Sequence, residues 1–144
     1  MLRNLLILIM LLMSSTVYSK CDEDSGSNYM KLRKFKDAYL SLKDCESLKS
    51  TSGLALGQLA FLYHFQKMGS FKDEHERITK AHELFIRSAL LGQRESVNYL
   101  INIYSNGEES LGIDKNECIS KCLASAYKDN SIESNVIGSC LKIK

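Results

Sequence analysis

The sequence contains no proline and no tryptophan among its 144 residues. Because proline is the residue that most strongly interrupts a helix, its absence favours uninterrupted helices along the chain. Excess charge is also lacking, since 19 basic and 17 acidic residues leave a formal net charge of +2. So small a charge gives no reason to expect nucleic acid or an anionic membrane as a partner. No segment alternates apolar and polar residues over a sustained stretch, so the sequence predicts no β-sheet.

Long apolar runs are missing too, except close to the N-terminus. There, a short segment with one basic residue precedes an uncharged apolar run from Leu5 to Met13. Three small polar residues follow, and Val17 and Ser19 then place a β-branched and a small residue at the two positions that a signal peptidase inspects. The run is shorter than the roughly 20 residues that a membrane-spanning helix needs, and this order of segments is typical of a secretory signal peptide. We therefore predict a signal peptide over 1–19 and an exported domain over 20–144. That domain is expected to be periplasmic or secreted, without a stable membrane anchor.

Five cysteines follow this segment, at Cys21, Cys45, Cys118, Cys122 and Cys140. In an exported chain they are expected to form disulfides, with one thiol left over. If the last two helices are antiparallel around a turn near Asn130, Cys140 lies opposite position 120, within reach of both Cys118 and Cys122. The shorter loop favours Cys122, and Cys118 remains the alternative partner. Cys21 is expected to fold back along the first helix in an extended segment and pair with Cys45.

Helical periodicity accounts for most of the chain after an irregular acidic stretch over 21–28. Six helices are predicted: one over about 29–45, one opening near 52, one from 71 to 92, one over 95–106, one from 114 and one after 131. Ser70 with Asp73, and Asp114 with Glu117, have the spacing of capping boxes at two of these helix starts. We predict an all-α domain.

One helical pattern occurs twice. Ala55-x-x-x-Leu59-Ala60-x-x-Tyr63 recurs as Ser96-x-x-x-Leu100-Ile101-x-x-Tyr104. Each copy precedes a second helix with small residues where paired helices would cross, and four positions of these second helices correspond: Ala81, Phe85, Ser88 and Ala89 in the first, Cys118, Cys122, Ser125 and Ala126 in the second.

These motifs resemble the Sel-one-like repeat family, a relative of the tetratricopeptide repeats, and the chain looks like a small exported, cysteine-containing member. The repeat units would span about 52–93 and 94–130, with partial units at both ends. The second unit departs from the family pattern at its two cysteines and at Asp129, where a glycine is usual. The resemblance implies a short α-solenoid of antiparallel helix pairs with a concave, protein-binding face, and it implies no catalytic residue.

The residues that could carry chemistry do not assemble into a recognisable site. His75-Glu76 opens like a zinc-protease motif but lacks the second histidine, and His82 lies about 10 Å further along the same helix, too far to share one zinc. Ser139 and Lys142 have the Ser-x-x-Lys spacing of penicillin-binding enzymes, but they lie on a terminal helix without walls around them. We expect no enzyme activity, no metal site and no cofactor.

The leading functional hypothesis, which follows from the resemblance, is an immunity protein. It would bind and neutralise a toxic effector in the periplasm, such as a secretion-system phospholipase or wall hydrolase encoded by a neighbouring gene. The alternative is an adaptor or scaffold for an envelope or host-facing protein complex, and a third class is a peptidoglycan- or penicillin-binding enzyme. Phe71, Arg94 and Tyr99 lie off the buried stripes or near loops and are candidate partner-binding residues.

Overall fold

The computed structural model describes residues 21–130 and 132–142, so the predicted signal peptide lies outside the described residues. Within these ranges the chain folds into seven α-helices and two short 3-10 helices, which confirms the predicted all-α class. The α-helices are α2 (Glu23–Lys31), α3 (Phe35–Leu42), α4 (Gly53–His64), α5 (Glu74–Leu90), α6 (Arg94–Asn106), α7 (Glu117–Lys128) and α8 (Ser134–Leu141), and the 3-10 helices are η1 (Cys45–Ser47) and η2 (Glu109–Leu111). None of the described helices has the length and apolarity of a membrane span.

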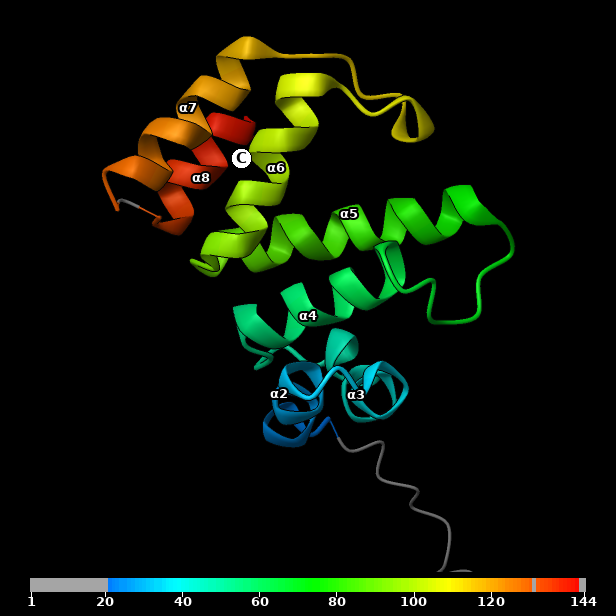
Figure 1. Cartoon of the computed structure of the whole chain (residues 1–144). Helices are drawn as coiled ribbons and strands as arrows, with labels where there is room; N and C mark the ends of the chain where they lie inside the picture. Colours follow the sequence, from blue (N-terminus) through cyan, green and yellow to red (C-terminus); the bar gives the residue numbers. More distant parts are fainter. Residues whose placement is uncertain (1–20, 131, 143–144) are drawn as a thin grey trace, which may run out of the picture.

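Consecutive helices pack as antiparallel pairs, and the pairs follow one another through the molecule (Figure 1). α2 lies against α3, α4 against α5, and α6 against α7, while α8 closes on α7 and α5. One core cluster of buried residues fills the space among α3, α4, α5 and η1, and a second fills the space among α5, α6, α7 and α8. The chain therefore forms a short α-solenoid of helix pairs.

The predicted single helix over 29–45 is wrong, because the structure has two helices there and the first begins earlier. Asp22 caps α2 by accepting a hydrogen bond from the Ser25 N–H at 3.0 Å, so the stretch predicted to be irregular is helical. α2 ends at Lys31, and Arg33 in the turn that follows has a φ of 56°, in the left-handed region. Gly26 lets α3 approach closely, since a Cβ there would lie 2.5 Å from the Leu42 side chain.

Two other helix starts differ from the predicted capping boxes, while α4 begins at the expected cap, Ser52. α5 starts after Asp73, whose carboxylate accepts from the Glu76 N–H at 2.8 Å, rather than after Ser70. α7 starts after Asn116, which accepts from the Ile119 N–H at 3.1 Å, rather than at Asp114. In both cases a later Asp or Asn supplies the side-chain acceptor that an N-cap requires.

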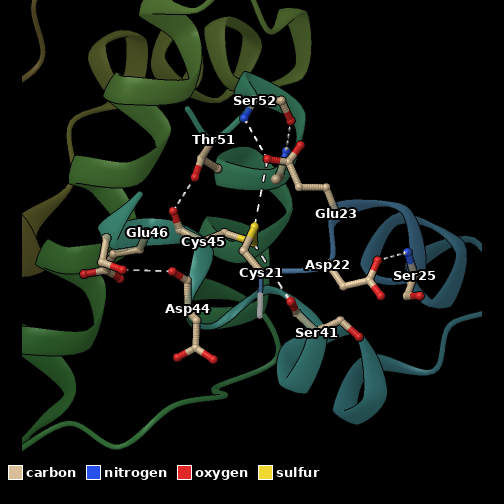
Figure 2. The surroundings of a disulfide bond; sticks show 12 residues. Cys21, Asp22, Glu23, Ser25, Ser41, Asp44, Cys45, Glu46, Thr51 and Ser52 are labelled. Atoms are coloured by element: carbon tan, nitrogen blue, oxygen red, sulfur yellow. Dashed lines mark hydrogen bonds between the residues drawn. A yellow bond between two sulfur atoms is a disulfide. The ribbon is translucent and has the colours of Figure 1, made fainter. Parts of the chain in front are cut away.

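The structure pairs Cys21 with Cys45 and Cys122 with Cys140, and Cys118 is free and exposed. The first disulfide joins the start of α2 to η1 (Figure 2). Because α2 and α3 form a hairpin, Cys21 reaches Cys45 without the extended segment that the sequence suggested. Beside the bond, the Glu23 carboxylate accepts a hydrogen bond from the Ser52 N–H at 3.0 Å, which connects α2 to the start of α4 (Figure 2).

Candidate functional site

A cleft of about 430 Å³ lies between α4 and α6, and we call it the α4–α6 cleft. α2 and α5 each add one residue to its wall. Its apolar lining consists of Met30, Leu54, Gly57, Phe61, Phe65, Phe85 and Tyr99, and its polar lining of Gln58, Gln93, Glu95, Ser96, Asn98 and Asn102. This volume and mixture of apolar surface with a few polar groups are typical of binding sites.

The α4 wall exists because α4 is apolar on two faces. One face carries buried residues such as Leu59 and Leu62, which belong to the core. The other carries Leu54, Phe61 and, just beyond the helix end, Phe65, at spacings that place them on one side. Leu54 and Phe65 are 44% and 52% exposed, so this second face gives the cleft an uncovered apolar rim.

The α6 wall combines one aromatic ring with two carboxamides. Tyr99 stacks on Phe85 of α5, with 3.8 Å between ring centroids. Asn98 and Asn102 are exposed, one helical turn apart, and their side chains make no hydrogen bond to any described residue. Across the cleft, Gln58 donates to the Ser27 hydroxyl at 3.3 Å, but its buried Oε1 has no partner within the described chain.

Charge is scarce in the cleft. Among the lining residues that the structure describes, Glu95 is the one charged side chain, and Gln93 donates a hydrogen bond to it. Four exposed basic residues lie outside the lining, at the end of α2, in the turn to α3 and at the start of α3: Lys31, Arg33, Lys34 and Lys36. The cleft is therefore suited to a neutral or positively charged group rather than to an anion.

A layer of partly buried titratable rings lies behind the α6 wall. The ring of Tyr99 contacts both His64 and His82, with centroid separations of 5.6 and 6.2 Å. Burial lowers the pKa of both imidazoles, and it raises the pKa of the Tyr99 phenol well above its usual range. The Tyr99 hydroxyl and the Nδ1 atoms of both histidines are buried without a hydrogen-bond partner in the described residues.

The structure places the three predicted partner-binding residues in different surroundings. Tyr99 lines the α4–α6 cleft. Phe71 lies in the α4–α5 loop and packs edge-on against Tyr63, with 4.9 Å between centroids. Arg94 lies over the ring of Tyr127 at 4.0 Å and donates to the Asn130 side chain at 2.7 Å, so its guanidinium joins α6 to the end of α7.

The residues screened for chemistry do not converge in the described parts of the chain. No group of three or more His, Cys, Asp or Glu side chains is placed to hold a metal ion there. The exposed His75 has its Nδ1 atom 2.8 Å from the Ser110 carbonyl oxygen. Ser139 and Lys142 are both exposed at the end of α8.

Sequence reasoning overlooked most of the cleft, although two signals were present. The spacing of Leu54, Gln58, Phe61 and Phe65 gives α4 a second, largely apolar stripe, and a surface helix that is apolar on two sides indicates a second contact. Asn98 and Asn102 are four residues apart, so both lie on the same face of α6. What no local pattern shows is that these two faces lie opposite each other.

Comparison with known proteins adds no identification. No family model, curated protein or solved structure matches the chain. The similarity to the Sel-one-like repeats therefore rests on the sequence motifs quoted above.

Proposed function

We propose that this chain is an exported protein-binding module that holds part of a partner protein in the α4–α6 cleft. The observation that carries the proposal is the uncovered apolar rim of that cleft, where Leu54 and Phe65 remain about half exposed beside the Tyr99 ring. Exposed apolar side chains around a concavity are typical of interaction sites. The two disulfides suit an oxidising compartment outside the cytoplasm.

Within this class we favour an immunity protein that neutralises a toxic effector in the periplasm. The support is the resemblance to exported helical-repeat proteins, together with a cleft that can hold the centre of an interface. An inhibitory complex buries about 800 Å² on each partner, and its binding energy is concentrated in a few aromatic or arginine anchors near the middle. Phe61, Phe65 and Tyr99 would be those anchors.

The test is rescue from a toxin encoded beside this gene. The full-length precursor should protect sensitive cells, whereas a version lacking residues 1–19 should not. Phe65→Ser should abolish protection, because it removes an exposed ring from the cleft rim. Leu40→Ser is the matched control, since Leu40 is 52% exposed on α3 and does not line the cleft.

Two outcomes would count against the proposal. Protection by the form without residues 1–19 would contradict an encounter in the periplasm. Equal protection by the Phe65→Ser and Leu40→Ser variants would contradict binding through the cleft. Failure of the precursor to protect, with capture of an envelope protein that depends on Phe65, would support the adaptor alternative.

A further inference from the structure

We infer that the α4–α6 cleft binds an extended, neutral-to-basic segment of its partner, and that this segment inserts one bulky apolar side chain. Carboxamides of the cleft would bind the main chain of the segment. The inference rests on the proposed function and specifies the chemistry of the partner at the same site.

The carboxamides supply the first argument. Each one offers a donor and an acceptor, the same pair that a peptide unit presents. On one wall, the side chains of Asn98 and Asn102 make no hydrogen bond to a described residue. On the other wall, Gln58 has a buried Oε1 atom without a partner among the described residues. A buried acceptor of this kind is normally hydrogen-bonded. Because the Oε1 atom is closed to solvent, the Gln58 side chain has to turn toward the cleft before a main-chain N–H can reach it.

The arrangement also favours an extended segment over a helix. In a helix, internal hydrogen bonds use the main-chain N–H and C=O groups away from the ends, so carboxamides along its side find no main-chain partner. An extended segment leaves these groups free. Its side chains point alternately to opposite sides, so one can enter the cleft while its neighbours face outwards.

The apolar surface between the carboxamides defines the inserted group. Phe61 and Phe65 line one side and Tyr99 the other, with Met30 contributed by α2. The space of about 430 Å³ is at the lower end of the range for ligand pockets. It suits one large aliphatic or aromatic side chain with its adjoining main chain.

The charge of the lining determines the flanking residues. The cleft has Glu95 but no lysine or arginine among its described lining residues. An acidic segment or a free terminal carboxylate would find no cation there, whereas lysine or arginine beside the anchor would face a carboxylate. An acidic partner would instead be attracted to the basic turn at Lys31–Lys36.

The experiment is an NMR titration of the protein. The full sequence, including residues 1–19, is expressed, and the protein is purified in the processed form that the cells produce. The probe is a ten-residue peptide with capped ends, a central leucine, two flanking lysines and otherwise serine, threonine and glycine. We expect it to shift the side-chain NH₂ signals of Gln58, Asn98 and Asn102. Replacing the leucine by alanine should weaken binding by about tenfold or more.

Two further peptides separate the elements of the inference. Methylating the main-chain nitrogens beside the leucine removes hydrogen-bond donors but keeps the side chain, and it should weaken binding about threefold to tenfold per lost bond. Changing both lysines to glutamates should also weaken binding. Unchanged affinity after N-methylation would overturn main-chain recognition. Tighter binding of the glutamate peptide, with shifts at Lys31–Lys36, would overturn the site and its charge preference.

Protein variants distinguish this inference from the proposed function. The Asn98→Ala, Asn102→Ala double variant should lose about tenfold or more in affinity for the leucine peptide if both bonds form. Asn28→Ala is the matched control, because Asn28 is also exposed on a helix but does not line the cleft. If the double variant still protects cells fully while Phe65→Ser does not, the proposed function stands and main-chain recognition fails. If the peptide binds as expected but the precursor never protects cells, the immunity proposal fails and the inference stands.

Discussion

Ser96 of α6 donates a hydrogen bond to Ser88 of α5, with 2.7 Å between the two hydroxyl oxygens. Ser88 in turn donates to the carbonyl oxygen of Gly53, at the start of α4, at 2.6 Å. Two buried hydroxyls therefore connect three consecutive helices at the base of the α4–α6 cleft. Gly57 lies directly against them, since a Cβ at this position would lie 2.8 Å from the Ser88 Oγ and 2.9 Å from the Ser96 Oγ.

The first prediction is that Gly57→Ala destabilises the protein, although alanine is the better helix former. Overpacking costs about 1–3 kcal/mol, and the gain in helix propensity offsets about 1 kcal/mol of it. We expect a net loss of about 1 kcal/mol in the free energy of urea unfolding. The loss should shrink in a Ser96→Ala background, where one of the two close oxygens is gone. A stabilising effect of Gly57→Ala in both backgrounds would show that the helices can separate here without cost.

The second prediction concerns pH. Burial is the main cause of the lowered pKa at His64 and His82; Arg77 lowers that of His64 further, and His64 lowers that of His82. Glu108 opposes the shift at both histidines, and Glu83 opposes it at His82. Because the pKa values in the folded state lie below the ordinary value of 6.5, the unfolded chain binds more protons in acid. The free energy of unfolding is therefore highest above about pH 6.5, and it declines as the pH falls through the folded pKa values of the two histidines.

The slope is at most about 1.4 kcal/mol per pH unit for each histidine. Urea unfolding between pH 7.5 and 5 measures it. His82→Phe should flatten the profile, because it removes a buried titrating group but keeps a ring against Tyr99. His75→Gln is the control, because it changes an exposed histidine on the same helix. Equal slopes in the wild type and the His82→Phe variant would contradict this assignment.

The sequence predicts this fold where a periodic apolar face coincides with a local cap. Ser52 followed by Ala55 and Leu59 was sufficient to place α4, and Gly92, with its φ of 84°, stands at the predicted end of the third helix. The prediction failed between 21 and 45, where the apolar spacing continues across the turn at Arg33 and no glycine or proline marks the break. The α4–α6 cleft depends on how two helix pairs stack, and that relationship is tertiary.

The third prediction concerns this unmarked turn. Arg33 has a left-handed conformation, which at the end of a helix is usually adopted by glycine. The Lys34 N–H donates a hydrogen bond back to the Tyr29 carbonyl oxygen at 2.9 Å. A side chain in this conformation costs roughly 1–2 kcal/mol, and glycine avoids that cost but gives the unfolded chain more freedom. We therefore expect Arg33→Gly to raise the free energy of unfolding by about 0.5–1 kcal/mol. Arg33→Ala is the control, because it removes the charge but keeps the Cβ, and it should not stabilise the protein.

The fourth prediction concerns the odd cysteine. Cys118 is exposed on α7, one turn before Cys122, whose Cα lies 5.5 Å from that of Cys140. Four residues of helix displace Cys118 by about 6 Å along the axis, and a disulfide needs Cα atoms within about 7 Å of each other. Cys118 is therefore expected to remain a thiol even when Cys122 is replaced. Titration should give one accessible thiol in the wild-type protein, and non-reducing peptide mapping should link Cys21 to Cys45 and Cys122 to Cys140.

The Cys122→Ser variant tests the geometry directly. It should contain two thiols, at Cys118 and Cys140, and should lose about 3 kcal/mol of stability, the value for a disulfide loop of about this length. Cys118→Ser is the matched control, because it should leave the disulfide map and the unfolding free energy nearly unchanged. A Cys118–Cys140 disulfide in the Cys122→Ser variant would show that α7 can slide by a turn against α8. In that case the second pairing, which the sequence left open, would be accessible to the native fold.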